Sequence, residues 1–250
     1  MKKLIIIASV LAFASCSSPV QHGDIPFVKF EGLKGNVLEV STSTYGARMR
    51  RGELVTDENP YLTAKRVYNK KGQIVEGINK GFDDDPELRH SEYSKFEYKR
   101  GKLASINNEN EFGGKKYSIL SKVIEDGKNE TIYEETSQDE TIKRKDVYDG
   151  LKISMYRDDG TLFQERTYNK TGLLIGICHY RDGEFFSSLT YELNENGEPI
   201  SETSVYKDDE PRICYYEYTS YDEKGNWLTR VEYDEMKYPN SVEVREIKYR

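Results

Sequence analysis

The sequence predicts an all-β fold, an elongated antiparallel β-meander of repeated hairpins that forms a single-layer or partly coiled sheet. Short turns that end in Gly recur along the chain, and segments of about eight to ten residues lie between them, several with polar and apolar residues alternating. Twenty tyrosines among 250 residues, with many Val, Ile and Thr, suit a pleated sheet and argue against disorder. We expect one domain over residues 27–250.

The turns share the pattern of an aromatic residue, then Asn, Asp or Arg, then polar residues and Gly. Tyr68 to Gly72, Tyr168 to Gly172 and Tyr221 to Gly225 are examples, and Tyr156, Tyr168 and Tyr180 follow one another at twelve-residue steps. Asn and Asp side chains bond the turn backbone, and Gly supplies the positive φ angle that such turns need. Loops of this length that end in Gly predict hairpin corners.

Two segments show the alternation best. In 184–193 the drier face carries Phe185, Leu189 and Tyr191. In 226–234 we expect the drier face to carry Trp227, Thr229, Val231 and Tyr233, and Arg230 and Glu232 to face water. Residues 83–96 are the best helix candidate, with Asp85 as a cap before Pro86, and a polar loop is an equal alternative.

The N-terminus has the layout of a secretion signal. Two lysines precede an apolar stretch that is too short to span a membrane, and small residues lead to Cys16. Phe13 to Cys16 resembles the bacterial lipobox, with Phe13 where Leu is usual. We expect residues 1–15 to be a lipoprotein signal peptide, Cys16 to be lipidated, and 16–26 to be a flexible tether. An ordinary signal with a chance Cys is the alternative.

Charge limits the partners. The 37 basic residues less the two lysines of the leader leave 35, against 44 acidic residues, a net charge of −9 for the mature chain. Such a chain repels nucleic acid, and it repels anionic head groups too, so we expect the membrane to be reached through the lipid.

The candidate chemistry gives no convincing catalytic site. Cys178 and Cys214 lie three strand steps apart in a simple meander, too far for a disulfide unless the sheet rolls up, so we favour two buried thiols. Neighbours in a strand, such as Cys178 and His179, point to opposite faces. No spacing fits zinc, and the acidic runs lack calcium-loop spacing. We expect no enzymatic activity, no metal and no cofactor.

Aromatic residues gather in the last forty positions. Tyr216, Tyr218, Trp227 and Tyr233 are candidates for stacking on a ligand such as a glycan. Cross-strand aromatic packing explains the same residues without a ligand, and we favour it.

The segment Tyr221 to Trp227, with its echoes at Tyr68, Tyr156 and Tyr168, resembles the YD repeats of Rhs-type proteins and the MORN-like hairpin repeats of bacterial envelope proteins. Residues 32–45 look like the first strand of such lipoproteins in Bacteroidota. The resemblance implies an extended meander without enzymatic activity. It also implies an outer-membrane lipoprotein on the periplasmic side, because Ser17 to Gln21 carry no acids.

Together these features predict a non-catalytic, lipid-tethered envelope lipoprotein that presents an extended β-repeat surface to another envelope protein. A glycan-binding lipoprotein that uses the C-terminal aromatics is the second hypothesis, and a hydrolase is the third.

Overall fold

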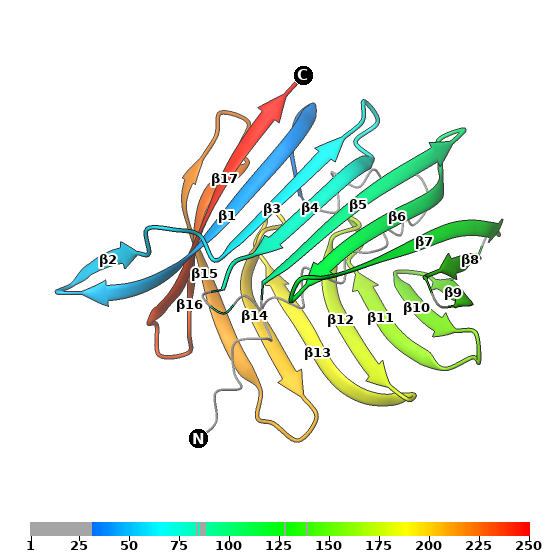
Figure 1. Cartoon of the computed structure of the whole chain (residues 1–250). Coiled ribbons are helices and arrows are strands. Elements are labelled where there is room, and N and C mark those ends of the chain that lie inside the picture. The colour runs from blue at the N-terminus through cyan, green and yellow to red at the C-terminus, as the bar shows by residue number, and fades with distance from the viewer. Residues whose placement is uncertain (1–31, 84, 86–88, 128, 139) are drawn as a thin grey trace.

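The computed structural model describes residues 32–250 except 84, 86–88, 128 and 139, and these residues form 17 antiparallel β-strands (Figure 1). The strands are β1 (Val37–Arg50), β2 (Glu53–Thr56), β3 (Leu62–Tyr68), β4 (Ile74–Gly81), β5 (His90–Lys99), β6 (Lys102–Phe112), β7 (Lys115–Asp126), β8 (Glu130–Thr136), β9 (Thr141–Asp149), β10 (Lys152–Arg157), β11 (Leu162–Tyr168), β12 (Leu174–Arg181), β13 (Glu184–Leu193), β14 (Pro199–Tyr206), β15 (Arg212–Tyr221), β16 (Trp227–Tyr233) and β17 (Pro239–Tyr249). The all-β prediction is confirmed.

The predicted turn chemistry is present at the hairpin corners. At Asn169, the side-chain Oδ1 accepts bonds from the backbone N–H of Thr171 at 3.0 Å and of Leu173 at 2.9 Å. The Gly172 N–H donates to the Asn169 carbonyl at 2.9 Å, with Gly172 at φ +86°. The same bonding recurs at the turns that begin with Asn69, Asn194, Asp222 and Asp234.

The meander closes on itself, which corrects the predicted open or partly coiled sheet. Each strand from β3 to β17 pairs with the next, and β1 pairs with both β17 and β3. The result is a closed barrel of sixteen strands, with β2 outside the ring as the second arm of a hairpin with β1. Closure removes the open sheet edges on which the predicted repeat surface depended.

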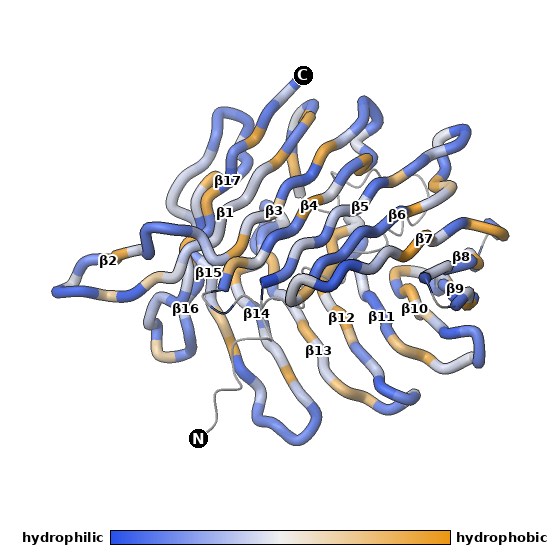
Figure 2. Tube along the Cα trace, in the orientation of Figure 1, coloured by the Kyte–Doolittle hydropathy of each residue, from blue (hydrophilic) through white to orange (hydrophobic). Residues whose placement is uncertain are grey.

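One face of every barrel strand points into the lumen. Residues opposite each other on neighbouring strands share a face, so the pairs Ser94–Asn108, Tyr133–Arg144 and Ile153–Arg166 belong to one wall. These side chains are among the most buried of the described residues, which identifies their face as the inner wall. Figure 2 shows hydrophilic and hydrophobic residues mixed along the strands.

The outer wall is charged around the ring. Its residues alternate with those of the inner wall, and many are Lys or Glu: Glu39, Lys65, Glu76, Lys95, Glu109, Lys122, Glu134, Lys143, Lys145, Lys152, Glu165, Glu192, Glu217, Glu246 and Lys248. Several pair across strands, such as Glu39, which lies 2.8 Å from both Lys65 and Lys248.

The prediction for 226–234 is confirmed in part: Trp227 and Val231 are buried as expected, at 6% and 2% exposed, but Arg230, which was expected to face water, is buried too. Arg230 and Glu232 lie on the inner wall, where Arg230 is 8% exposed, and Val231 and Tyr233 lie on the outer wall. The expectation for 184–193 is confirmed in part, since Leu189 and Tyr191 face inward.

The turns that begin at Asn69, Asn169, Asn194 and Asp222 and the C-terminus lie at one end of the barrel, which we name the closed end. Residues 32–36 cross it. The Lys34 N–H donates to Asn226 Oδ1 at 2.7 Å, and Asn226 Nδ2 donates back to the Lys34 carbonyl at 2.9 Å. Leu33 packs with Phe96 and Ile106 in the core cluster on β1 and β3 to β6, and Gly32 lies close to Leu173 and Gly197.

The other end, which we name the open end, leaves inner-wall side chains exposed. On the inner face of β6, Ile106 is 0% exposed near the closed end and Phe112 is 52% exposed near the open end. The exposed fraction of the inner-face side chains rises in the same way on β7, from Ser121 to Tyr117, and on β9, from Asp146 to Ile142. The exposed fraction of the inner-wall side chains therefore rises toward the open end.

Two further predictions concern residues 83–96 and the N-terminal segment. The helix predicted over 83–96 is wrong, because β5 begins at His90. The predicted signal peptide 1–15, the lipidated Cys16 and the tether 16–26 lie outside the described residues. The first residues of the predicted domain 27–250 lie outside them as well.

Candidate luminal site

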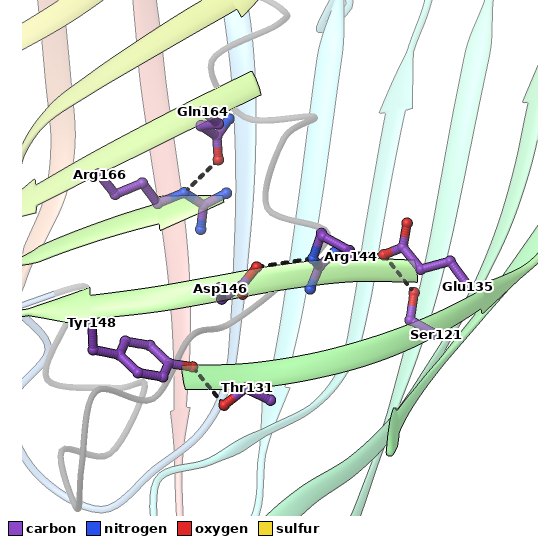
Figure 3. A network of polar contacts seen from close by, with 8 residues as sticks. All are labelled: Ser121, Thr131, Glu135, Arg144, Asp146, Tyr148, Gln164 and Arg166. Carbon is purple, nitrogen blue, oxygen red and sulfur yellow. Dashed lines mark hydrogen bonds and ion pairs between the residues drawn. The ribbon is translucent and has the colours of Figure 1, made fainter. Parts of the chain in front are cut away.

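A network of buried polar side chains lines the inner wall from β7 to β11 (Figure 3). Its centre is Arg144 on β9, whose Nε donates to Asp146 Oδ1 at 3.0 Å and whose Nη1 donates to Glu135 Oε1 at 2.6 Å. Glu135 also accepts a bond from the Ser121 hydroxyl at 3.2 Å. Alternation along β9 places Arg144 and Asp146 on the same face, two residues apart.

Two polar atoms of this network lack a hydrogen-bond partner among the described residues. They are Arg144 Nη2, a donor, and Asp146 Oδ2, an acceptor, and both are buried. The face of the Arg144 guanidinium lies 4.1 Å from the centre of the Tyr133 ring. Buried polar atoms without partners are rare in folded proteins, and they mark places where a water or a ligand group is bound.

Burial and neighbouring charges shift the pKa values of both Asp146 and Arg144. Burial raises the pKa of the Asp146 carboxyl above its ordinary value, and the nearby Arg144 and Arg166 only partly offset this. Burial lowers the pKa of Arg144, but Asp146 and Glu135 more than compensate, so its net shift is upward. Arg144 therefore stays charged, and it is held by two carboxylates.

The network continues toward β12. Arg166 Nε donates to Gln164 Oε1 at 2.8 Å, and Gln164 Nε2 lies 3.3 Å from His179 Nδ1. Burial lowers the pKa of His179, and Arg166 adds to the shift, so this imidazole is neutral at pH 7. At the closed-end side, the Tyr148 hydroxyl bonds Thr131 at 2.9 Å.

A second luminal cluster contains three of the four predicted stacking residues. Tyr216 and Trp227 have cationic side chains over their rings, Arg230 at 4.2 Å and Arg245 at 3.4 Å respectively. The Tyr218 ring lies 5.6 Å from Trp227. These faces are therefore already occupied, which gives the glycan hypothesis no added support.

Tyr233, the fourth predicted stacking residue, does not join the cluster. It lies on the outer wall opposite Tyr215, and its hydroxyl donates to Glu217 Oε2 at 3.0 Å. The Tyr216 hydroxyl makes the equivalent bond on the inner wall, to Glu202 Oε2 at 3.1 Å.

The cysteines are both free, as we favoured, but each is only partly buried and not buried as predicted. Cys178 pairs in register with Glu165 on the outer wall, and Cys214 pairs with Glu202 on the inner wall, so the sheet itself separates them. Burial raises the pKa of Cys214 to about 12, so this thiol is protonated. Among the described residues, no group of His, Cys, Asp and Glu is arranged to hold a metal ion.

The Arg144–Asp146 network was absent from the sequence predictions. Strand β9 carries Lys143 and Lys145 on its other face, so charge alone did not mark the buried side. The signal available in the sequence was a pair of opposite charges two residues apart, Arg144 and Asp146. They are flanked by Ile142 and Tyr148 on the same face of the strand.

Comparisons with known proteins bear on the fold. No family model matches the sequence, and no curated protein matches it. Among solved structures, the chain is similar to a porin-like protein from Bacteroides uniformis ATCC 8492, with a TM-score of 0.50 and 13% identity over 85% of this chain and 96% of that one. At this identity the likeness shows the barrel fold alone.

These findings correct the predicted family and function. The closed barrel and its porin-like neighbour contradict a YD-repeat or MORN-like meander, and with it an extended repeat surface for protein–protein interaction. The short Tyr and Gly motifs specify hairpin corners, which open repeats and closed barrels both use. Within the described residues, no helix is long and apolar enough to cross a membrane.

Proposed function

We propose that this chain is an outer-membrane-associated protein whose barrel stands in water and takes a polar ligand into its lumen through the open end. In this proposal it binds without catalysis. It is held to the membrane by a lipid on Cys16 and lies on the periplasmic side, because the residues after Cys16 carry no acids.

The charged outer wall supports a barrel in water. A Lys or Arg on the lipid-facing side of a membrane barrel costs about 2–4 kcal/mol at the bilayer midplane. Lys65, Lys122 and Lys145 all point outward, as do glutamates on many other strands of the ring. A wall of this kind is stable against water and unstable against acyl chains.

Binding in the lumen is carried by one observation, the rise in exposure of the inner wall toward the open end. Near the closed end the inner-wall side chains are buried and fill the interior, so the space for a ligand lies toward the open end, where Phe112 and Tyr117 are 52% and 49% exposed. Residues 32–36 lie over the closed-end turns that contain Leu173 and Asn226, so in this proposal the ligand enters from the open end. The partnerless atoms of Arg144 and Asp146 are buried within this packed wall, so in this proposal the ligand contacts inner-wall residues nearer the open end, such as Asn110 and Tyr117.

A matched pair of substitutions tests luminal binding. Asn110 faces the lumen between Glu92 and Tyr117, whereas Asn107 on the same strand faces outward between Lys95 and Leu120. We expect protein released from envelopes to carry an added mass in native mass spectrometry. Asn110→Trp should remove it, and Asn107→Trp should keep it. No added mass on the wild type, or equal loss from both variants, would contradict the proposal.

A pore is the second candidate, and the porin-like fold favours it. It predicts stepwise conductance when the purified protein is added to planar bilayers. Under our proposal the same experiment gives no conductance steps.

A further inference from the structure

The hairpin formed by the end of β1 and by β2, residues 47–56, projects from the barrel (Figure 1). Within the described residues, β2 pairs only with β1 and otherwise touches β17. Two-stranded ribbons have little stability of their own in water. A ribbon that leaves a closed barrel is therefore a candidate for docking on something else.

The two faces of this hairpin differ in chemistry. Met49 pairs with Leu54 on one face, and both side chains are more than 40% exposed. The other face carries Arg48 and Arg50, and Arg51 follows at the tip. Residues 47–56 hold three Arg and one Glu, but Arg48 is paired with Asp57 at 2.5 Å, so the positive charge of the hairpin is at its tip, on Arg50 and Arg51.

The apolar face belongs to a wider ring of exposed side chains at the open end. The turn between β16 and β17 lies beside the hairpin, because Ser241 pairs with Gly46 at the hairpin base. Every large apolar or aromatic side chain that the structure leaves more than 45% exposed lies at this end: Met49, Phe82, Phe112, Tyr117, Met236 and Tyr238. Exposed apolar side chains that gather at one end of a molecule indicate a candidate interaction site.

We propose that the open end docks on a phospholipid surface through this hairpin. Arg50 and Arg51 would bind lipid phosphates, and Met49, Leu54 and Met236 would insert at the acyl boundary. Tyr238 suits the interface, where its ring is buried and its hydroxyl stays wet. This docking does not depend on what the lumen binds.

Two observations favour a membrane as the occupant. The basic hairpin complements anionic phosphate, whereas the acidic remainder of the chain would repel a second copy. The seventeen residues from Cys16 to Leu33 can extend to about 60 Å. A ten-residue strand is about 34 Å long. A lipid on Cys16 therefore leaves the barrel free to turn its open end to the bilayer.

Vesicle flotation tests the docking. The mature chain with Cys16→Ser is mixed with vesicles of phosphatidylethanolamine and phosphatidylglycerol, so that no lipid anchor contributes. We expect it to float with the vesicles, and we expect Met49→Ser with Leu54→Ser to weaken partitioning by about tenfold or more. Arg50→Glu with Arg51→Glu should weaken it and reduce its salt dependence.

The matched control lies at the closed end. Leu38 and Leu151 are exposed to a similar degree, so Leu38→Ser with Leu151→Ser should keep wild-type partitioning. Thermal melting should be the same for all variants, since these side chains are at the surface. Wild-type protein that stays with the soluble fraction, or equal partitioning of hairpin and control variants, would overturn the proposal.

A photo-reactive residue at position 54 distinguishes a lipid from a protein partner. In cells, crosslinks to phospholipid support the proposal. One reproducible protein adduct without lipid adducts would contradict it. Failure of luminal binding would leave the flotation result unchanged, so the two proposals are tested separately.

Discussion

The inner and outer walls of the barrel place carboxyl groups in different electrostatic surroundings. On the inner wall, burial raises the pKa values of Glu92, Asp146, Glu202 and Glu232. On the outer wall, bonds from Lys248 and Lys65 lower the pKa of Glu39. The pKa values of glutamates on the inner wall and of Glu39 on the outer wall are therefore shifted in opposite directions. Burial on the inner wall, and not residue type, therefore determines whether the pKa of these carboxyls is raised or lowered.

The largest expected effect comes from placing one charge on each wall of β6. Ile106→Asp buries an unpaired carboxylate in the closed-end core, and we expect the free energy of unfolding to fall by more than about 4 kcal/mol. Asn107→Asp, on the outer wall beside Lys95, should change it by less than about 0.5 kcal/mol. Urea unfolding followed by circular dichroism measures both. Similar losses for the two variants would break the distinction between the walls.

Removing one partner from an ion pair should show the same contrast on a smaller scale. Asp146→Ala leaves Arg144 buried with only Glu135 to hold it, so we expect a loss of about 3–5 kcal/mol. Glu165→Ala breaks a pair with the half-exposed Lys152 and removes the acceptor of the Ser154 and Tyr180 hydroxyls, which water can replace on the outer wall, so the loss should be about 1–2 kcal/mol. The same unfolding measurement applies. An Asp146→Ala loss as small as the Glu165→Ala loss would mean that the network is solvated.

Tyr216 and Tyr233 form a matched pair of single hydroxyls, one on each wall. Each donates to a glutamate, at 3.1 and 3.0 Å. Tyr216→Phe leaves the buried Glu202 without that donor, and we expect a loss of about 1–2 kcal/mol. Tyr233→Phe exposes Glu217 to water, which replaces the bond, so the loss should be below about 0.5 kcal/mol. Thermal melting compares the two, and a larger loss for Tyr233→Phe would contradict the assignment of faces.

The smallest effect is on the pH dependence of stability. For the inner-wall carboxyls, a folded-state pKa above the ordinary 4.5 of Glu means that stability is fully present below 4.5 and is lost as the pH rises through the raised pKa. For Glu39, the lowered pKa means that stability is present above 4.5 and is lost in acid. We expect the melting temperature to rise as the pH falls from about 7.5 to about 5, and to fall in stronger acid.

Substitution of the inner carboxyls sharpens that test. Glu202→Gln with Glu232→Gln should flatten the gain between about pH 7.5 and 5, because two raised pKa values are removed. Glu165→Gln on the outer wall should leave the gain in place. A melting temperature that falls steadily from neutral to mildly acidic pH would contradict the raised pKa values.

Local chemistry explains what the sequence could predict. Asn169 and Gly172 specify their turn through bonds within five residues, so the hairpins were visible without any tertiary information. Ring closure depends on pairing of Val37 with Tyr249, which are more than two hundred residues apart, and no local pattern marks it. The inner face was misassigned in 226–234 because Arg230 is paired with Glu243 at 2.7 Å and stacked on Tyr216, which makes burial of a charge tolerable.

The central claim is that the charged outer wall of this closed barrel contacts water. Sedimentation velocity of the mature chain with Cys16→Ser in detergent-free buffer tests it most directly. We expect a monodisperse species with a β-sheet circular dichroism spectrum. A chain that aggregates in buffer and disperses only in micelles or bilayers would contradict the account, because the outer wall would then need lipid.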